Sequence, residues 1–375
     1  MATASAPELK LSAAPRLVSL DAFRGVTIAL MVLVNTPGDW NHVYAPLQHA
    51  EWHGWTLTDT VFPSFLWIAG VAITLSLARR MASGAPRKKL IFQALRRAAI
   101  LYALGVFMYA FPHFETLRIL GVLQRIAICY FAAVVIYLFT KPRGQIAWIV
   151  SLLAGCWLLM MLVPVPGYGA GRLDIEGNLA HWVDRVVLGP YNYKPTATWD
   201  PEGIVSTLPA IATTLLGIMA GHILRLRRAL SERTVWLFFV GILLLALGLV
   251  CNNWLPINKK LWTSSFALFM GGLDFVVFGI FLWWCDGLGR QRLVKPFVIL
   301  GMNAITVYMA SEVCIEALSA LPGPGGVPLR DWLYQTVFAP LASPINASLI
   351  WGTAYTAVMW LFAFLLYRRR WFIRV

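Results

Sequence analysis

The sequence predicts an all-α membrane protein, a polytopic helix bundle with about ten transmembrane helices. Hydrophobic residues make up 59% of the 375 positions and charged residues only 13%, whereas soluble domains carry about 25% charged residues. Stretches of roughly 20 mainly apolar residues, the length that crosses a bilayer, recur along the chain. We place these spans at 18–36, 59–79, 92–111, 119–140, 145–164, 203–224, 234–252, 262–285, 296–318 and 348–367.

The net charge of +14 is distributed in alternating loops. Most lysines and arginines lie near the N-terminus or in segments 79–97, 141–143, 225–233, 290–295 and 368–374. This is the positive-inside pattern, which predicts an even number of spans with both termini in the cytoplasm and argues against nucleic-acid binding. We expect residues 1–15 to form a flexible cytoplasmic tail and 16–375 a single transmembrane domain. The run after Arg24 lacks a cleavage site, so it should remain as the first helix.

The five cysteines lie singly in apolar runs without the spacing of a metal or redox site. We therefore interpret them as small core residues and predict no metal centre. The sequence has no evident internal repeat, which weakly disfavours a transporter made of inverted repeats.

Three of the six histidines, His42, His49 and His53, lie in the loop between the first two spans. Histidine takes and gives a proton near neutral pH, so such a group is a candidate for chemistry. A structural role is the simpler interpretation for His42 and His53. His49 differs because Asn35 ends the preceding span and Asp59 begins the next.

Asp59 has two compatible interpretations. In the run Thr56-Leu57-Thr58-Asp59, Thr58 or Asp59 would cap the second helix. The Asp59 carboxylate could also orient a histidine and stabilise its protonated form. Asn35, in turn, is an ordinary residue at which a helix stops.

Other charged groups within apolar spans are candidates for function because burying them in lipid is costly. Asp21 and Arg24 can pair at the start of the first span, or Arg24 can serve at a phosphate entrance. Arg118 and Arg125 are seven residues apart, which places both on one face of the fourth span. Their guanidinium groups suit phosphate, and the competing interpretation is structural pairing with Asp59 or Glu115.

The ninth span carries Asn303, Tyr308, Ser311 and Glu312 on one face, for which helix–helix hydrogen bonds are the alternative to a site. The loops 37–58, 165–202 and 319–347 on the histidine side are long and rich in aromatic residues. Loop 165–202 adds carboxylates, a mixture that suits sugars, although an interfacial aromatic belt explains it equally well.

Six motifs occur in an order that resembles the heparan-alpha-glucosaminide N-acetyltransferase family. They are LDAFRG at 20–25, QHAEWHGWTLTDTVFP at 48–63, GVLQR at 121–125, DPEG at 200–203, INKKLW at 257–262 and GMNA at 301–304. The resemblance implies a multi-pass membrane enzyme that moves acetyl from cytoplasmic acetyl-CoA to an amino sugar on the other side. It also implies that His49 is the essential catalytic residue and that Asn35 lies beside the acetyl group.

The sequence differs from the family's lysosomal members in two ways. It does not include their extra N-terminal luminal region and first helix, and its Asn35–His49 spacing is longer. The natural acceptor is therefore open. Bacterial relatives are associated with amino-sugar use, so we expect a multi-pass protein of a bacterial inner membrane.

These considerations give a set of predicted site residues. We predict that His49 is the general base or acetyl carrier, that Asp59 orients it, and that Asn35 donates to the oxyanion. For acetyl-CoA we predict contacts with Arg24, Gln124, Arg125 and Asn303, and for the amino-sugar acceptor contacts with Trp52, Asp200, Glu202 and Glu312.

Two other function classes stay open. The same polar groups could form the transport site of an amino-sugar permease that does no chemistry. An O-acetyltransferase of an envelope polysaccharide would use the same donor with another acceptor. The sequence does not decide whether the protein forms a homodimer.

Overall fold

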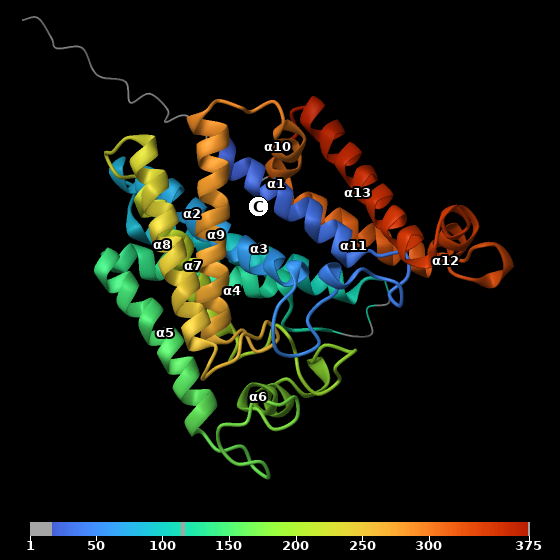
Figure 1. Cartoon of the computed structure of the whole chain (residues 1–375), viewed down its shortest axis with the longest axis horizontal. Helices are drawn as coiled ribbons and strands as arrows, with labels where there is room; N and C mark the ends of the chain where they lie inside the picture. The colour runs from blue at the N-terminus through green and yellow to red at the C-terminus, as the bar shows by residue number, and fades with distance from the viewer. Residues whose placement is uncertain (1–16, 113, 115–116, 374–375) are drawn as a thin grey trace, which may run out of the picture.

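The computed structural model is a bundle of α-helices, and it describes residues 17–112, 114 and 117–373 (Figure 1). Over that part of the chain, nine helices are long and apolar enough to cross a membrane, and a bent pair brings the number to ten. This confirms the all-α, polytopic prediction. The expected tail, residues 1–15, lies outside the described residues.

The nine long helices match the predicted spans to within a few residues, and four shorter helices accompany them. The long ones are α1 (Val18–Asn35), α2 (Leu57–Ala82), α3 (Arg87–Ala110), α4 (Val122–Phe139), α5 (Pro142–Leu162), α7 (Thr207–Leu224), α8 (Leu230–Cys251), α9 (Ser264–Phe281) and α13 (Pro344–Arg368). The shorter ones are α6 (Leu179–Val187), α10 (Lys295–Met302), α11 (Ala304–Ala320) and α12 (Leu329–Leu333).

The predicted continuous span 296–318 is wrong in one respect, because it is broken. Helices α10 and α11 meet at an angle of 80° at Asn303. The buried Asn303 amide donates to the Trp371 carbonyl over 3.1 Å and accepts from the Ile373 amide over 3.0 Å. The segment after α13 is thereby fastened to the break, a long-range contact that hydropathy does not reveal.

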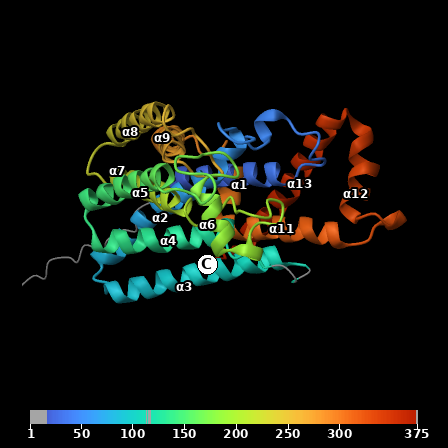
Figure 2. The same cartoon turned by 90° about the horizontal axis from the view of Figure 1, so that it is seen from below.

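Small residues allow the central helices to pack closely. Helix α2 packs against α7, where a Cβ on Gly217 would lie 1.9 Å from the Trp67 carbonyl oxygen. Helix α1 packs against α10, where a Cβ on Gly301 would lie 2.0 Å from the Asp21 carbonyl oxygen. Such close approach is a usual source of stability for helices in lipid. In Figure 2, α3 and α4 lie on the opposite side of the bundle from α8 and α9.

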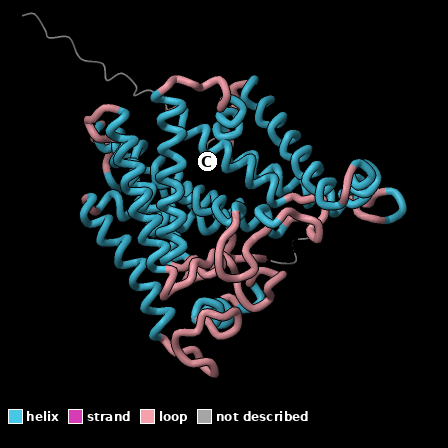
Figure 3. Tube along the Cα trace, viewed as in Figure 1, coloured by secondary structure: helices cyan, strands magenta, loops and turns pink. Residues whose placement is uncertain are grey.

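The connections divide between two ends of the bundle. At the basic end lie the short connections α2–α3, α4–α5, α7–α8 and α9–α10 together with residues 369–373. At the loop end lie the long connections 36–56, 163–206, 252–263 and 321–343, which Figure 3 shows gathered mainly around α6 and α12. Val18 donates to Asp286, and Ile373 donates to Asn303, so both ends of the described chain lie at the basic end. That agrees with an even number of spans.

Candidate functional site

The centre of the candidate site is a pair formed by His49 and Asp59 at the loop end. The Nδ1 atom of His49 lies 2.6 Å from Oδ1 of Asp59. A carboxylate only accepts hydrogen bonds, so Nδ1 carries the proton and Nε2 of the neutral ring keeps a free lone pair. The His49 side chain is 46% exposed while that of Asp59 is 1% exposed. The pair therefore presents a basic nitrogen to the surface with its carboxylate behind it.

Asp59 is held in place by the start of α2. Its Oδ2 atom accepts from the amides of Ala50 and Thr56, each over 3.0 Å. The Thr56 side chain accepts in return from the Asp59 backbone, which completes a capping box. Asp59 thus bonds to His49 and closes the capping box from the third helical position, while the N-cap itself is Thr56 and not Thr58 or Asp59 as predicted.

Three charges act on His49. The Lys259 ammonium and partial burial lower the pKa of His49, and Asp59 and Glu202 raise it by less. The net direction is downward from the ordinary value, so the imidazole is mainly neutral at pH 7. A neutral ring is the form that can accept a proton.

A second polar group surrounds Arg118. Its guanidinium donates to both carboxylate oxygens of Asp200 over 2.8 and 2.6 Å and to Glu202 over 2.5 Å. The rings of Tyr109 and Tyr193 lie 4.5 and 4.3 Å from it, so the ion cluster is enclosed. Two points differ from expectation. Arg118 precedes α4 instead of lying on it. Its acidic partners are Asp200 and Glu202 and not Asp59, and Glu115, the other expected partner, lies outside the described residues.

The segment 200–204 owes its shape to α6. The buried Asp184 carboxylate accepts from the amides of Asp200 and Ile204 over 3.3 and 2.9 Å. A Cβ on Gly203 would lie 2.0 Å from Asp184, which explains why the DPEG motif ends in glycine. Burial raises the pKa of Asp184 to about 6. Arg118, Lys259 and Arg125 together outweigh the burial of Glu202 and keep its pKa below the ordinary value.

Asn35 lies at the end of α1 and contacts a different acid. Its amide nitrogen donates to Glu312 of α11 over 2.9 Å. Tyr109 lies within electrostatic reach of Glu312, Arg118 and Glu202, and Glu202 is within reach of His49. Six of the predicted site residues, Asn35, His49, Asp59, Asp200, Glu202 and Glu312, are therefore parts of one electrostatically linked region at the loop end. We call this region the polar site; it comprises Asn35, His49, Asp59, Tyr109, Arg118, Asp200, Glu202, Lys259 and Glu312.

Gln124 and Arg125 lie deeper, on α4, and both are fully buried. Gln124 donates to the Arg118 carbonyl over 3.2 Å, and Arg125 donates to the Gly203 carbonyl over 3.0 Å. The Oε1 atom of Gln124 and the Nε and Nη1 atoms of Arg125 have no hydrogen-bond partner among the described residues. Buried polar groups are rarely left unpaired, so these atoms can engage a ligand.

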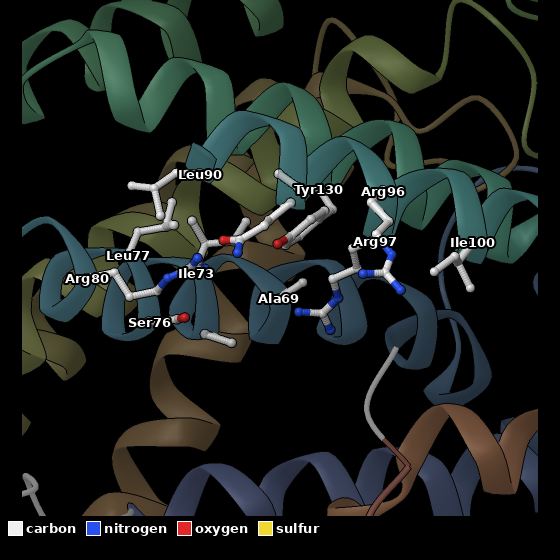
Figure 4. Close-up of a pocket in the computed structure, with 13 residues that line it drawn as sticks. Ala69, Ile73, Ser76, Leu77, Arg80, Leu90, Arg96, Arg97, Ile100 and Tyr130 are labelled. Carbon is white, nitrogen blue, oxygen red and sulfur yellow. The ribbon is translucent and has the colours of Figure 1, made fainter. Parts of the chain in front are cut away.

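A cavity of about 470 Å³ lies between α1, α2, α4 and the α10–α11 break. Arg24 and Arg97 line it, together with Tyr130 and with Ile373 of the chain's last described segment. An adjacent cavity of about 370 Å³ shares Arg97 and Tyr130 and adds Arg80 and Arg96. Figure 4 shows Arg80 and Arg97 reaching into the space between α2 and α3. We call the two together the basic cavity, because four arginines surround it.

The remaining predicted residues have mainly structural contacts. Trp52 donates to the Leu173 carbonyl over 2.9 Å and packs edge-on against His181 and Trp199. Asn303 is engaged with residues 371 and 373, although its neighbours Gly301 and Met302 line the basic cavity. Arg24 donates to Asp21 and to the Gly301 carbonyl, each over 3.4 Å.

Sequence reasoning missed Tyr109 and Lys259 as members of the polar site. Tyr109 gave no signal, because it is one aromatic residue at the end of an apolar helix. Lys259 stands within the INKKLW motif, so a signal was present, but nothing in the sequence tied that motif to the histidine loop.

Comparison with known proteins agrees with these features. The family model described as "Heparan-alpha-glucosaminide N-acetyltransferase, catalytic" matches residues 16–257. The chain belongs to this family. The proteins named heparan-alpha-glucosaminide N-acetyltransferase from Homo sapiens and Mus musculus are 31% and 30% identical to it, over 80% and 82% of this chain. The matches cover 53% and 55% of those two proteins, so the chain spans about half of their length.

The matched range of the heparan-alpha-glucosaminide N-acetyltransferase family includes both halves of the central pair, His49 and Asp59. It also includes Arg118 with its two acids, and the buried Arg125. Lys259 and Glu312 follow it in the sequence. The polar site is thus assembled from the family's catalytic segment and from residues beyond it.

Proposed function

We propose that the protein transfers an acetyl group from cytoplasmic acetyl-CoA to the amine of a glucosamine-type sugar on the opposite side of the membrane. Membership of the N-acetyltransferase family supports the reaction class. The observation that carries the proposal is the His49–Asp59 pair, a neutral imidazole with a free Nε2 at the loop end of the bundle. In this proposal the basic end faces the cytoplasm of a bacterial cell.

The reaction needs an uncharged amine, and His49 supplies the base. Nε2 removes the proton as the sugar nitrogen attacks the thioester carbon, and Asp59 stabilises the imidazolium that forms. The C–N bond forms, the C–S bond breaks, and the imidazolium returns its proton to the departing CoA thiolate. Glu202 and Glu312 are carboxylates that can accept from sugar hydroxyl groups at the same end.

The donor enters, in this proposal, from the basic cavity. Guanidinium groups bind phosphate in a planar fork, and the four arginines of that cavity match the phosphates of CoA. The pantetheine arm carries amides, which can satisfy the unpaired atoms of Gln124 and Arg125 between the two ends. The position of Arg24 in the basic cavity supports its predicted contact with acetyl-CoA, whereas Gln124 and Arg125 line neither part of that cavity and their predicted contacts stay predictions.

A direct test uses the protein purified in detergent with acetyl-CoA and glucosamine. We expect release of free CoA, read with a thiol reagent, and a product whose acetyl group survives mild alkali as an amide does. A permease would release no CoA, and an O-acetyltransferase would give an alkali-labile ester. Either of those results would contradict the proposed N-acetyl transfer.

The route of the acetyl group is a separate question with its own measurement. The protein would be incubated with labelled acetyl-CoA in the absence of acceptor. Direct transfer predicts no label on the protein, whereas an acetyl-imidazole intermediate predicts label on His49. Initial rates that require donor and acceptor together would agree with direct transfer.

Replacing Asp59 by asparagine is expected to lower the turnover number by roughly 10²-fold or more, because an amide stabilises the imidazolium poorly. The initial rate of CoA release measures this. Asp39→Asn is the matched control, since Asp39 bonds to His42 over 2.6 Å in the same loop. Equal effects of the two substitutions would assign the loss at Asp59 to loop structure.

Replacing Asn35 by alanine is expected to lower the turnover number by about 10²–10³-fold if its amide donates to the oxyanion. One N–H of the amide is used by Glu312, and the second is available for the acetyl oxygen. Asn346→Ala serves as a control, because that exposed amide at the start of α13 bonds Tyr44 and Ser343 away from the polar site. A change in KM without a change in turnover would remove the oxyanion role.

A further inference from the structure

An apolar groove of about 670 Å³ lies between α5 and α8, and it shares no residue with the polar site or the basic cavity. Its floor includes buried side chains of the helices behind it, Leu216 of α7 and Phe275 of α9. Its rims carry large apolar side chains that are more than half exposed, such as Val150 of α5 and Leu243 of α8. We call it the lateral groove, because it opens on the outer side of the bundle, where a membrane protein meets lipid.

The lateral groove runs from the loop end of the helices to the basic end. Trp254 and Leu255 line it at the loop end, and Pro142 and His222 line it at the basic end. Nε2 of His222 lies 2.8 Å from Oε1 of the buried Gln145, and because an amide oxygen only accepts, Nε2 is the donor. Nδ1 of the neutral ring keeps a lone pair and has no hydrogen-bond partner within the described part of the chain. The basic end of the groove therefore offers an acceptor for a hydroxyl group.

Free cations lie beside that end of the groove. Lys141 and Arg143 flank the proline that begins α5. Arg225 and Arg227 follow α7, and Arg225 is within electrostatic reach of His222. These four basic side chains are exposed, and none of them forms a hydrogen bond or an ion pair with the residues that the structure describes. An apolar channel that ends among unpaired cations matches a ligand with an apolar body and an anionic head.

We propose that the lateral groove is a binding site for an anionic phospholipid, whose acyl chains lie along the groove and whose phosphate lies among the basic residues. Basic pockets between transmembrane helices bind such headgroups. A second copy of this chain fits less well, because two copies packed side by side at this face would bring the loops that carry Arg225 and Arg227 together, and like charges repel. The bound lipid fills the space between α5 and α8 and so stabilises the packing of both helices.

The test uses the full chain purified in detergent and offered equal amounts of phosphatidylglycerol and phosphatidylcholine with the same acyl chains. Native mass spectrometry counts the lipid of each kind that stays bound. We expect phosphatidylglycerol to be retained in preference, since the two lipids differ in net charge. Arg225→Gln combined with Arg227→Gln should lower its retention by roughly 10- to 30-fold, because each basic residue near an anionic headgroup contributes to binding. Lys88→Gln combined with Lys89→Gln is the matched control, which removes the same charge from exposed lysines at the start of α3, outside the groove.

Ala154→Phe tests the apolar part of the site. Ala154 lines the lateral groove, so a phenyl ring there occupies the space of an acyl chain and should lower the retention of phosphatidylglycerol severalfold. Ala103→Phe makes the same change in a groove of about 500 Å³ between α3 and α4 that no charged residue lines. Retention in that variant should equal retention in the unmodified protein.

Equal retention of the two lipids by the unmodified protein would overturn the inference, and so would equal losses in the arginine and lysine variants. If the unmodified protein retained no lipid and Ala154→Phe converted it from a dimer to a monomer, the groove would be an interface between copies instead. Lipid retention is measured without acetyl-CoA. Failure of the proposed acetyl transfer therefore leaves this inference standing, and loss of lipid preference leaves the proposed transfer standing.

Discussion

Replacing His49 by alanine is expected to lower CoA release by about 10²–10⁴-fold, the usual contribution of a well-placed general base. The half-exposed side chain contributes little to packing, so the melting temperature in detergent should change little. The measurement is the initial rate of CoA release with donor and acceptor in excess, together with a thermal unfolding scan of both proteins.

His42→Ala is the natural control for that experiment. His42 lies in the same loop, is 48% exposed and bonds Asp39 at the same 2.6 Å distance that joins His49 to Asp59. It is outside the polar site, so its loss should leave the rate unchanged. If His49→Ala released CoA as fast as His42→Ala, His49 would not be the general base.

Replacing Arg118 by methionine is expected to destabilise the protein by about 3–5 kcal/mol, the usual cost of removing one partner from a buried ion pair. Arg118 and the two carboxylates it binds are almost wholly buried, and the rings of Tyr109 and Tyr193 pack against the guanidinium. The measurement is the midpoint of thermal unfolding in detergent, which should fall markedly.

Arg172→Met tests whether burial is the cause. Arg172 bonds Asp174 over 2.6 Å, but both side chains are largely exposed, so no measurable shift of the unfolding midpoint is expected. If the two arginine substitutions lowered the midpoint equally, the stability of the fold would not depend on the enclosed cluster around Arg118.

Hydropathy and charge predicted most of the fold because they are local properties. Nine spans appear as expected, since the length of an apolar run and the basic residues that flank it decide where a helix crosses. The break at Asn303 was missed because its cause is contact with residues 371 and 373, about seventy positions away. A hydropathy window of about twenty residues does not include two segments that lie so far apart in the sequence.

The candidate site likewise has one part that could be predicted from neighbouring residues and another that depends on contacts distant in the sequence. The His49–Asp59 pair could be anticipated because a single loop and one helix start join the two residues. The partners of Arg118 lie 82 and 84 residues further along the chain, where α6 and its Asp184 set the course of the backbone. Lys259 reaches His49 only through pairing of two loops some 200 residues apart. The catalytic roles themselves remain predictions until the variants are measured.

The attachment of residues 371–373 to Asn303 bears on biosynthesis. Ile373, which forms part of the wall of the basic cavity, follows all the described helices, α1 to α13, in the sequence. The cavity beside Arg24 is therefore completed only after α13 has been made. A growing chain would therefore form the histidine loop early and complete the wall of the basic cavity only after residues 371–373 have emerged.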